Sequence, residues 1–159
     1  RPPGLRLAIV GDGPARGELE LDAPAGAIFL GERHAAALAD VYASADVFCF
    51  ASTTDTFGQV LLEAGASGLP VVAAAAGGAL ELVAHGYTGL LVTPADPHAF
   101  AGALVDLADS EPLRRRLGTG GRSEALERTW DRSLDELRAA YRQLTAPSRL
   151  PSARRRVAA

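Results

Sequence analysis

Short apolar runs alternate with longer amphipathic stretches along most of the chain. Apolar runs of this length, bounded by glycine and proline, are typical of buried strands, whereas the stretches between them have the spacing of helices. The pattern predicts strands at residues 5–10, 27–30, 45–50, 71–75 and 89–92. It predicts the intervening helices at residues 14–21, 34–43, 57–67 and 79–84. Strands that alternate with helices indicate an α/β fold, with a mostly parallel sheet flanked by helices.

The last third of the chain is predicted to be helical, at residues 97–108, from residue 111 onwards, and at residues 131–144. We expect the helix from residue 111 to break within residues 118–121, where glycines cluster. Leu134, Leu137 and Tyr141 keep helical spacing, so we expect them to face the domain or a partner domain. From residue 145 the chain is polar and contains prolines. We therefore predict one folded domain at residues 1–144 and a disordered tail at 145–159.

Composition excludes several classes of protein. The chain has 159 residues, 48% of them hydrophobic, which is enough for the core of one soluble domain. Its net charge is −3, so the chain lacks the excess of positive charge that binds nucleic acid, and we expect no nucleic-acid partner. The histidines have no metal-ligand spacing with carboxylates or with the single cysteine, and no metal is expected. No apolar run is long enough to span a bilayer; we expect a cytoplasmic location and leave peripheral association with a membrane open.

Three details of composition sharpen this picture. Cys49 lies in the apolar run 45–50, which favours a buried strand residue over a reactive thiol. The chain starts at Arg1 and contains no methionine, so we expect it to be a piece of a longer protein. All 16 basic residues are arginine, which excludes a Schiff-base lysine within the chain.

The most informative residues lie where a polar loop becomes the predicted helix 57–67. Asp55 precedes the helix and Glu63 follows in it. The free N–H groups at a helix start, together with the helix dipole, are suited to binding phosphate, and nearby carboxylates accept hydrogen bonds from sugar hydroxyls. A loop that offers both predicts a nucleotide-sugar site. The expected backbone donors are Phe57, Gly58, Gln59 and Val60.

The same loop resembles a known family. Ser52, Asp55, Phe57, Gly58, Glu63 and Ala64 follow the pattern S-x-x-E-x-F-G-x-x-x-x-E-A, which contains the E-x7-E motif of retaining GT-B glycosyltransferases of the family-four type. Asp55 stands where the family usually has glutamate. Other stretches fit as well, among them Gly11-Asp12-Gly13-Pro14 and Gly77-Gly78, and the resemblance covers roughly residues 5–144.

This resemblance implies that the chain is the C-terminal, Rossmann-like half of a GT-B fold, which binds a nucleoside-diphosphate sugar as donor. In the family, the residue matching Glu63 accepts hydrogen bonds from the ribose, and the one matching Asp55 contacts the transferred sugar. Gly11 and Gly13 would form a turn close to the donor pocket, and Arg33 would lie where the family contacts the base. No separate cofactor is implied, and GDP-mannose and UDP-glucose are the donors to test first.

The resemblance also implies that part of the site is missing. The family's donor domain begins one βα unit earlier, with a Gly-Arg and a Lys-Gly that clamp the diphosphate. The acceptor, whether glycan, lipid or small molecule, would bind through an N-terminal domain. We therefore expect this chain alone to be inactive.

Several alternatives stay open at this point. Asp55 is in the position of an N-cap, and Glu63 could be an ordinary solvated glutamate. The whole chain could be a non-catalytic nucleotide-binding or scaffold module of the same fold, or part of an epimerase acting on a nucleotide-sugar. A dehydrogenase is the weakest rival, because the spacing from Gly11 and Gly13 to Gly17 is one residue too long for a dinucleotide fingerprint.

Overall fold

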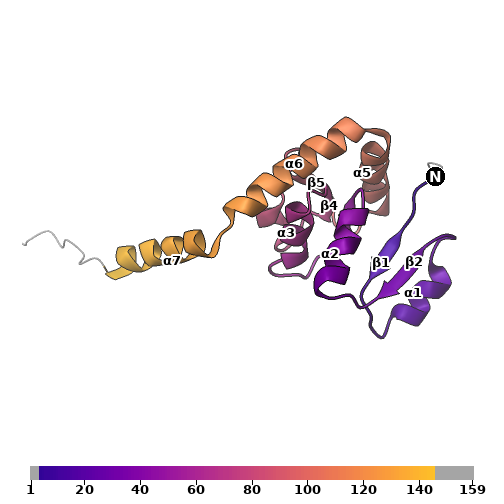
Figure 1. Cartoon of the computed structure of the whole chain (residues 1–159), viewed down its shortest axis with the longest axis horizontal. Coiled ribbons are helices and arrows are strands. Elements are labelled where there is room, and N and C mark those ends of the chain that lie inside the picture. The colour runs from indigo at the N-terminus through magenta and orange to yellow at the C-terminus, as the bar shows by residue number, and fades with distance from the viewer. Residues whose placement is uncertain (1–3, 146–159) are drawn as a thin grey trace, which may run out of the picture. The chain divides into compact units, whose positions relative to one another are not determined.

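The computed structural model describes residues 4–145, which fall into two compact units that divide between Leu126 and Glu127. Strands and helices alternate through the first unit (Figure 1). The strands are β1 (Ala8–Val10), β2 (Ile28–Gly31), β3 (Phe48–Phe50), β4 (Val71–Ala74) and β5 (Gly89–Val92). The helices are α1 (Arg16–Asp22), α2 (Ala35–Ser44), α3 (Gln59–Ala66), α4 (Ala79–Leu82), α5 (Pro97–Asp109), α6 (Glu111–Glu127) and α7 (Trp130–Thr145). The α/β class and all five predicted strands are confirmed.

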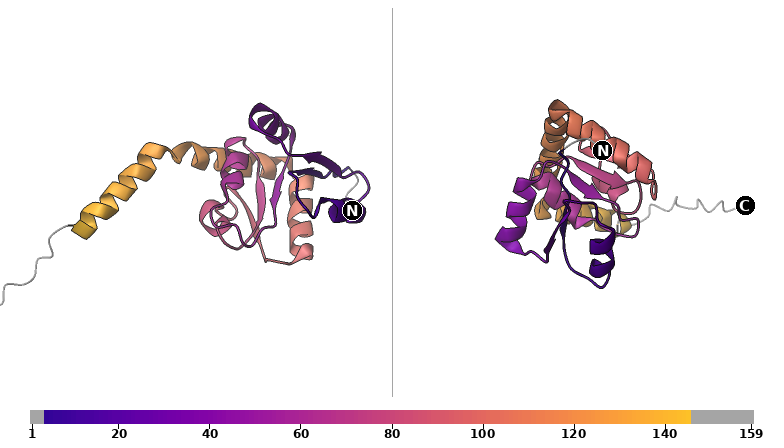
Figure 2. Two further views of the ribbon diagram at one scale, coloured as in Figure 1. Left: turned by 90° about the horizontal axis from the view of Figure 1, so that it is seen from below. Right: turned by 90° about the vertical axis from the view of Figure 1, so that its right-hand side faces the viewer.

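The strands form two parallel sheets rather than one. β1 pairs with β2, with Ala8 opposite Ile28. β4 lies between β3 and β5, with Val71 opposite Phe48 on one side and Gly89 on the other. No ladder joins the pair to the three-stranded sheet in the part of the chain that the structure describes. Figure 2 shows the indigo β1–β2 pair apart from the magenta strands that follow.

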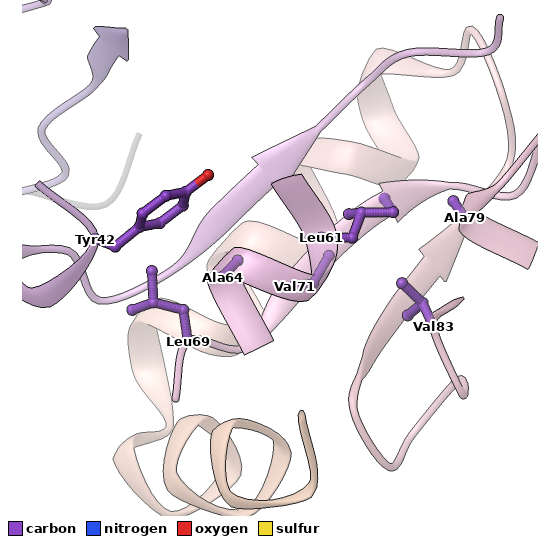
Figure 3. Packing of buried hydrophobic residues seen from close by; sticks show 8 residues of the cluster. Tyr42, Leu61, Ala64, Leu69, Val71, Ala79 and Val83 are labelled. Carbon is purple, nitrogen blue, oxygen red and sulfur yellow. The ribbon is translucent and has the colours of Figure 1, made fainter. Parts of the chain in front are cut away.

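The three-stranded sheet carries the core, because helices cover both of its faces. All four residues of β4 are buried, as its unbroken apolar run predicts. One cluster packs Val71 and Ala73 against Tyr42 of α2 and Leu61 of α3, and Figure 3 shows its members. On the opposite face, Val72 packs against residues of α5 and α6. The alternation of neighbouring β4 residues between these two clusters is what a strand with period-two side chains requires.

The β1–α1–β2 segment is different, because it has almost no interior. Among described residues 4–31 only Gly31 is buried, and it has no side chain. Neither apolar cluster includes a residue of this segment. Leu7 of its leading loop and Ile28 of β2 are 43% and 49% exposed. This segment therefore contributes strand pairing but little buried apolar area.

Cys49 is exposed, so the prediction of a buried residue is wrong. It lies in β3 as expected, with the aromatic rings of Phe48 and Phe50 packed into the Tyr42 cluster on one face. Cys49 points to the other face, where α5 and α6 cover β4 and β5, and β3 is the edge strand of this sheet. The burial prediction failed because a strand's apolar run does not say whether both faces are covered.

The predicted break at residues 118–121 is also wrong, since α6 is continuous from Glu111 to Glu127. Its glycines are buried and lie against other backbone segments. A Cβ added at Gly118 would collide with the carbonyl of Gly68, and one at Gly65 would lie 3.1 Å from the carbonyl of Gly121. Close packing against α3 and the loop after it therefore outweighs the low helix propensity of glycine.

The second unit contains α7, which starts one residue before the predicted helix and ends at Thr145. Ion pairs such as Arg138–Asp135 (3.0 Å) connect positions on its surface. Leu134, Leu137 and Tyr141 are exposed in this chain, and their expected contact with a partner domain stays a prediction. The predicted tail lies outside the described residues, apart from Thr145, which belongs to the helix. Within residues 4–145, no helix is both long enough and apolar enough to cross a membrane.

Alanine at two glycines should separate packing from helix propensity. Gly118→Ala should lower the free energy of unfolding by roughly 1–3 kcal/mol, because the added methyl group overpacks the contact with Gly68. Gly102→Ala in α5 is the matched control, since nothing lies within 4 Å of the added Cβ. It should raise stability by roughly 0.5–1 kcal/mol. Urea denaturation measures both, and stabilisation by Gly118→Ala would show that the contact is loose.

Candidate functional site

Asp55 organises the loop between β3 and α3. Its Oδ1 accepts hydrogen bonds from the N–H of Phe57 (2.9 Å) and the N–H of Gly58 (2.5 Å). The N–H of Asp55 in turn donates to Oγ of Ser52 at 3.2 Å. The carboxylate is therefore a cap for the turn that leads into α3, as one of the two readings of the sequence predicted.

The helix begins at Gln59, two residues after the predicted start, because Gly58 adopts a left-handed conformation (φ 77°). Glycine has no Cβ and takes this conformation without strain. Gln59 and Val60, as the first residues of α3, have N–H groups without an acceptor inside the helix. Of the four predicted donors, these two remain available, whereas Phe57 and Gly58 already donate to Asp55. The side chain of Phe57 is 59% exposed beside this helix start.

The loop after β4 packs against the same backbone. The N–H of Gly78 donates to the carbonyl of Asp55 at 3.0 Å. A Cβ at Gly77 would collide with that carbonyl, and a Cβ at Gly78 would lie 2.5 Å from the carbonyl of Phe57. The two adjacent glycines thus allow two loops at the C-terminal ends of β3 and β4 to touch through their main chains. The sequence singled out this glycine pair, but not the loop that it contacts.

Glu63 lies in the second turn of α3 and is half-buried. Its Oε2 accepts a hydrogen bond from the hydroxyl of Tyr42 in α2 (3.1 Å), and its Oε1 one from Nε2 of Gln59 (3.4 Å). Desolvation, followed by the negative charge of Glu63 and this hydrogen bond, raises the pKa of Tyr42 to about 12. Tyr42 was not among the predicted site residues. Its only signal in the sequence is its place on the apolar face of a helix.

Gly11, Gly13 and Arg33 lie at the C-terminal ends of β1 and β2. The N–H of Gly11 donates to the carbonyl of Gly31 at 2.9 Å, and Gly11 has a φ of 121°. The N–H of Gly13 donates to the carboxylate of Asp12 (2.8 Å), and Arg33 donates to its neighbour's carbonyl. These bonds stay within the β1–β2 segment. The structure therefore gathers Asp55, the α3 start and Glu63 in one place, and Gly11, Gly13 and Arg33 in another.

Two further features bear on the chemistry. Among residues 4–145, no group of three or more histidine, cysteine, aspartate and glutamate side chains is placed to hold a metal ion. A hollow of about 460 Å³ is lined by residues that include Tyr87, Arg115 and Arg116. Tyr87 precedes β5, whereas Asp55 follows β3, so this hollow lies toward the opposite end of the parallel sheet and is separate from the site.

Comparison with known proteins identifies the family. The sequence matches the family described as "Glycosyl transferases group 1" over residues 1–110. The chain belongs to this family. It is 45% identical over 138 residues to a GDP-mannose-dependent alpha-mannosyltransferase of Mycolicibacterium smegmatis, covering 86% of this chain and 36% of that protein. It is 38% identical to a D-inositol 3-phosphate glycosyltransferase of Stackebrandtia nassauensis, covering 96% of this chain and 38% of that one.

Solved structures of other proteins share the fold. Sucrose-phosphate synthase from Thermosynechococcus elongatus superposes with a TM-score of 0.75 and 32% identity, over 90% of this chain and 39% of its own. Anabaena Alr3699/HepE, solved in complex with UDP-glucose, gives a TM-score of 0.75 and 29% identity over 90% of this chain and 42% of its own. The predicted fold, the Rossmann-like C-terminal half of a GT-B glycosyltransferase, is confirmed. The chain spans just over a third of the length of these two curated relatives.

Removing the cap at Asp55 should destabilise the chain. Asp55→Ala should lower the free energy of unfolding by roughly 0.5–2 kcal/mol, because the N–H groups of Phe57 and Gly58 lose their acceptor. Asp55→Asn keeps a side-chain oxygen and should cost less. Asp96→Ala is a positive control, since Asp96 caps α5 through the N–H groups of His98 and Ala99. Equal losses for the alanine and asparagine variants in urea denaturation would contradict the capping role.

The Tyr42–Glu63 contact predicts a pH dependence on the alkaline side. A tyrosine ionises near pH 10 in an unfolded chain, whereas Tyr42 has a pKa of about 12 in the folded one. The folded state therefore holds the proton more tightly, and this stabilisation is complete below pH 10 and disappears between pH 10 and about 12. Tyr42→Phe should remove this component from the stability profile. Tyr141→Phe, at an exposed position of α7, is the control.

Proposed function

We propose that this chain is the donor-binding part of a glycosyltransferase, which moves a sugar from a nucleoside-diphosphate sugar to an acceptor. The main support for the proposal is the start of α3. There the carboxylate of Asp55, two available N–H groups at Gln59 and Val60, and the carboxylate of Glu63 follow one another along the chain. Gln59 and Glu63 are four residues apart in α3, about 6 Å along the helix axis. The diphosphate lies at the helix start, and the ribose reaches one turn further along to Glu63.

Asp55 has two tasks that do not compete, because a carboxylate has two oxygens. Oδ1 caps the turn through Phe57 and Gly58, and Oδ2 is the oxygen that accepts from a hydroxyl of the transferred sugar. Aspartate is one methylene shorter than the glutamate usual in the family, which places Oδ2 closer to the loop. The aspartate at position 55 therefore affects which sugar the site accepts.

The start of α3 assists the reaction by stabilising the leaving group. As the bond between sugar and phosphate breaks, negative charge grows on the diphosphate, and the N–H groups of Gln59 and Val60 with the positive end of the helix dipole stabilise it. A well-placed donor of this kind contributes roughly 3 kcal/mol of transition-state stabilisation. Glu63, held by Tyr42, orients the nucleotide.

The relatives support a nucleotide-sugar donor without selecting the base. One is named for its dependence on GDP-mannose, and Anabaena Alr3699/HepE was solved with UDP-glucose. Transfer with retention of configuration, a cytoplasmic location and an acceptor bound by another domain are further parts of the proposal. Since the chain spans just over a third of its relatives, we expect it to bind nucleotide weakly and to catalyse no transfer alone.

Calorimetric titration with UDP and with GDP tests this assignment on the chain and on the longer protein that contains it. One nucleotide should bind, and Glu63→Ala should weaken it by tenfold or more, because a hydrogen bond to a charged group contributes about 1.5–3 kcal/mol. Glu124→Ala, at an exposed position of α6, is the matched control. If a folded protein binds neither nucleotide, the chain is instead a scaffold module of the same fold.

A further inference from the structure

The hollow of about 460 Å³ lies between the middle of α6 and the turn that leads into β5. Its size falls within the range of about 300–1,000 Å³ that is usual for small-molecule sites. The lining residues are Tyr87, Arg115, Arg116, Thr119, Gly120 and Ser123. None of these six has a carboxylate, and every one except the glycine has a side chain that donates hydrogen bonds. The lining is therefore positively charged and suited to an anion.

The walls of the hollow are fixed without a ligand. In the turn before β5, the N–H groups of Tyr87 and Thr88 donate to the carbonyl of Ala84 at 3.0 and 2.9 Å. The hydroxyl of Thr88, which is buried, accepts from the N–H of Ala84 at 2.9 Å. On the other wall, a Cβ added at Gly120 of α6 would collide with the carbonyl of Tyr87. Because the turn and the helix are in such close contact, a ligand would not have to order them.

Arg116 brings a positive charge that no neighbouring carboxylate offsets. Its Nη1 donates to the carbonyl of Gly86 at 2.8 Å, and it makes no ion pair among residues 4–145. A guanidinium has five N–H donors in a planar fork that matches two oxygens of a phosphate, so four donors remain. Arg115 is paired with Glu111 at 2.6 Å, but both side chains are exposed. Exposed pairs of this kind contribute little to stability, so a ligand phosphate competes with Glu111 for Arg115.

Three hydroxyl groups of the lining are unpaired within the described residues. A serine or threonine in a helix often donates to the carbonyl four residues earlier, as Ser44 and Thr145 do at 2.7 and 2.8 Å. Thr119 and Ser123 of α6 make no such bond in the described chain, and the hydroxyl of Tyr87 makes none either. Each of these hydroxyls is free to donate to a ligand and to accept from it.

We propose that this hollow binds a phosphorylated sugar, with the phosphate on Arg116 and the sugar ring against Tyr87. The side chain of Tyr87 is 49% exposed, and its ring offers an apolar surface to the C–H groups of a sugar. The hydroxyls of Thr119 and Ser123 pair with hydroxyls of the sugar. A bare phosphate ion, only a few water molecules in size, would leave most of the hollow to solvent. A neutral sugar would leave the charge of Arg116 without a partner.

This ligand would bind away from the start of α3. Tyr87 precedes β5 and Asp55 follows β3, and these are opposite ends of a parallel sheet. The ligand therefore takes no part in the transfer of a sugar at Asp55 and Glu63. The inference does not depend on the proposed function, and it stands whether or not the chain binds a nucleotide.

Calorimetric titration of the longer protein that contains this chain tests the proposal, with glucose 6-phosphate, inorganic phosphate and glucose as probes. Glucose 6-phosphate should bind. Inorganic phosphate should bind at least tenfold more weakly, because it does not reach Tyr87, and glucose should not bind at the same concentrations. Binding of glucose 6-phosphate should weaken when sodium chloride is added, since salt screens exposed charges.

Two variants locate the bound sugar phosphate. Arg116→Gln should weaken its binding tenfold or more, because charge-assisted hydrogen bonds to the phosphate are lost. Arg122→Gln is the matched control, since Arg122 also lies on α6 and donates to a backbone carbonyl, that of Ala66, at 2.8 Å, but does not line the hollow. Ser123→Ala removes no hydrogen bond within the described chain, so it should fold normally and weaken binding threefold or more.

Four outcomes would overturn the proposal. A folded protein that does not bind glucose 6-phosphate has no such site. Affinity unchanged by both Arg116→Gln and Ser123→Ala would place the compound elsewhere on the protein. Displacement of glucose 6-phosphate by UDP or GDP would place it at the start of α3 instead. Equal affinities for inorganic phosphate and glucose 6-phosphate would show that the hollow binds a bare anion and makes no use of the sugar.

Discussion

The candidate site depends on a main-chain contact between two loops at the ends of neighbouring parallel strands. β4 is buried on both faces and paired on both edges, so its end is fixed in space. Gly78, in the loop that follows, donates to the carbonyl of Asp55. The side chain of Asp55 then sets the turn into α3 through Phe57 and Gly58. A rigid central strand thus positions a helix start, which is the part of the site that can hold an anion.

The sequence was sufficient to predict elements whose cause is local. Apolar runs identified all five strands, and the helix predicted from residue 97 begins there in the structure, where Asp96 caps the first turn of α5. It was not sufficient where the cause is a distant contact. α6 stays helical because its glycines meet the backbone around Gly65 and Gly68, and nothing near residue 118 in the sequence indicates that contact.

The residues of the candidate site show the same difference between local patterns and distant contacts. Asp55, Gly58 and Glu63 were found because they lie within nine residues of one another and share a pattern. The hydroxyl of Tyr42 reaches Glu63 from 21 residues away, on another helix, and its contact could only be seen in the structure. The resemblance assigned Gly11, Gly13 and Arg33 to the same pocket, and the structure places them in the loops that follow β1 and β2, which form a separate sheet. Their role as ligands stays a prediction.

The two sheets differ in what stabilises them. The three-stranded sheet has apolar clusters on both faces, one with α2 and α3 and the other with α5 and α6. The β1–α1–β2 segment has no buried side chain among its described residues, so strand pairing is its main stabilising contact. Asp55 and Glu63 therefore lie where a packed core fixes the start of α3, whereas the turn at Gly11 has no such support.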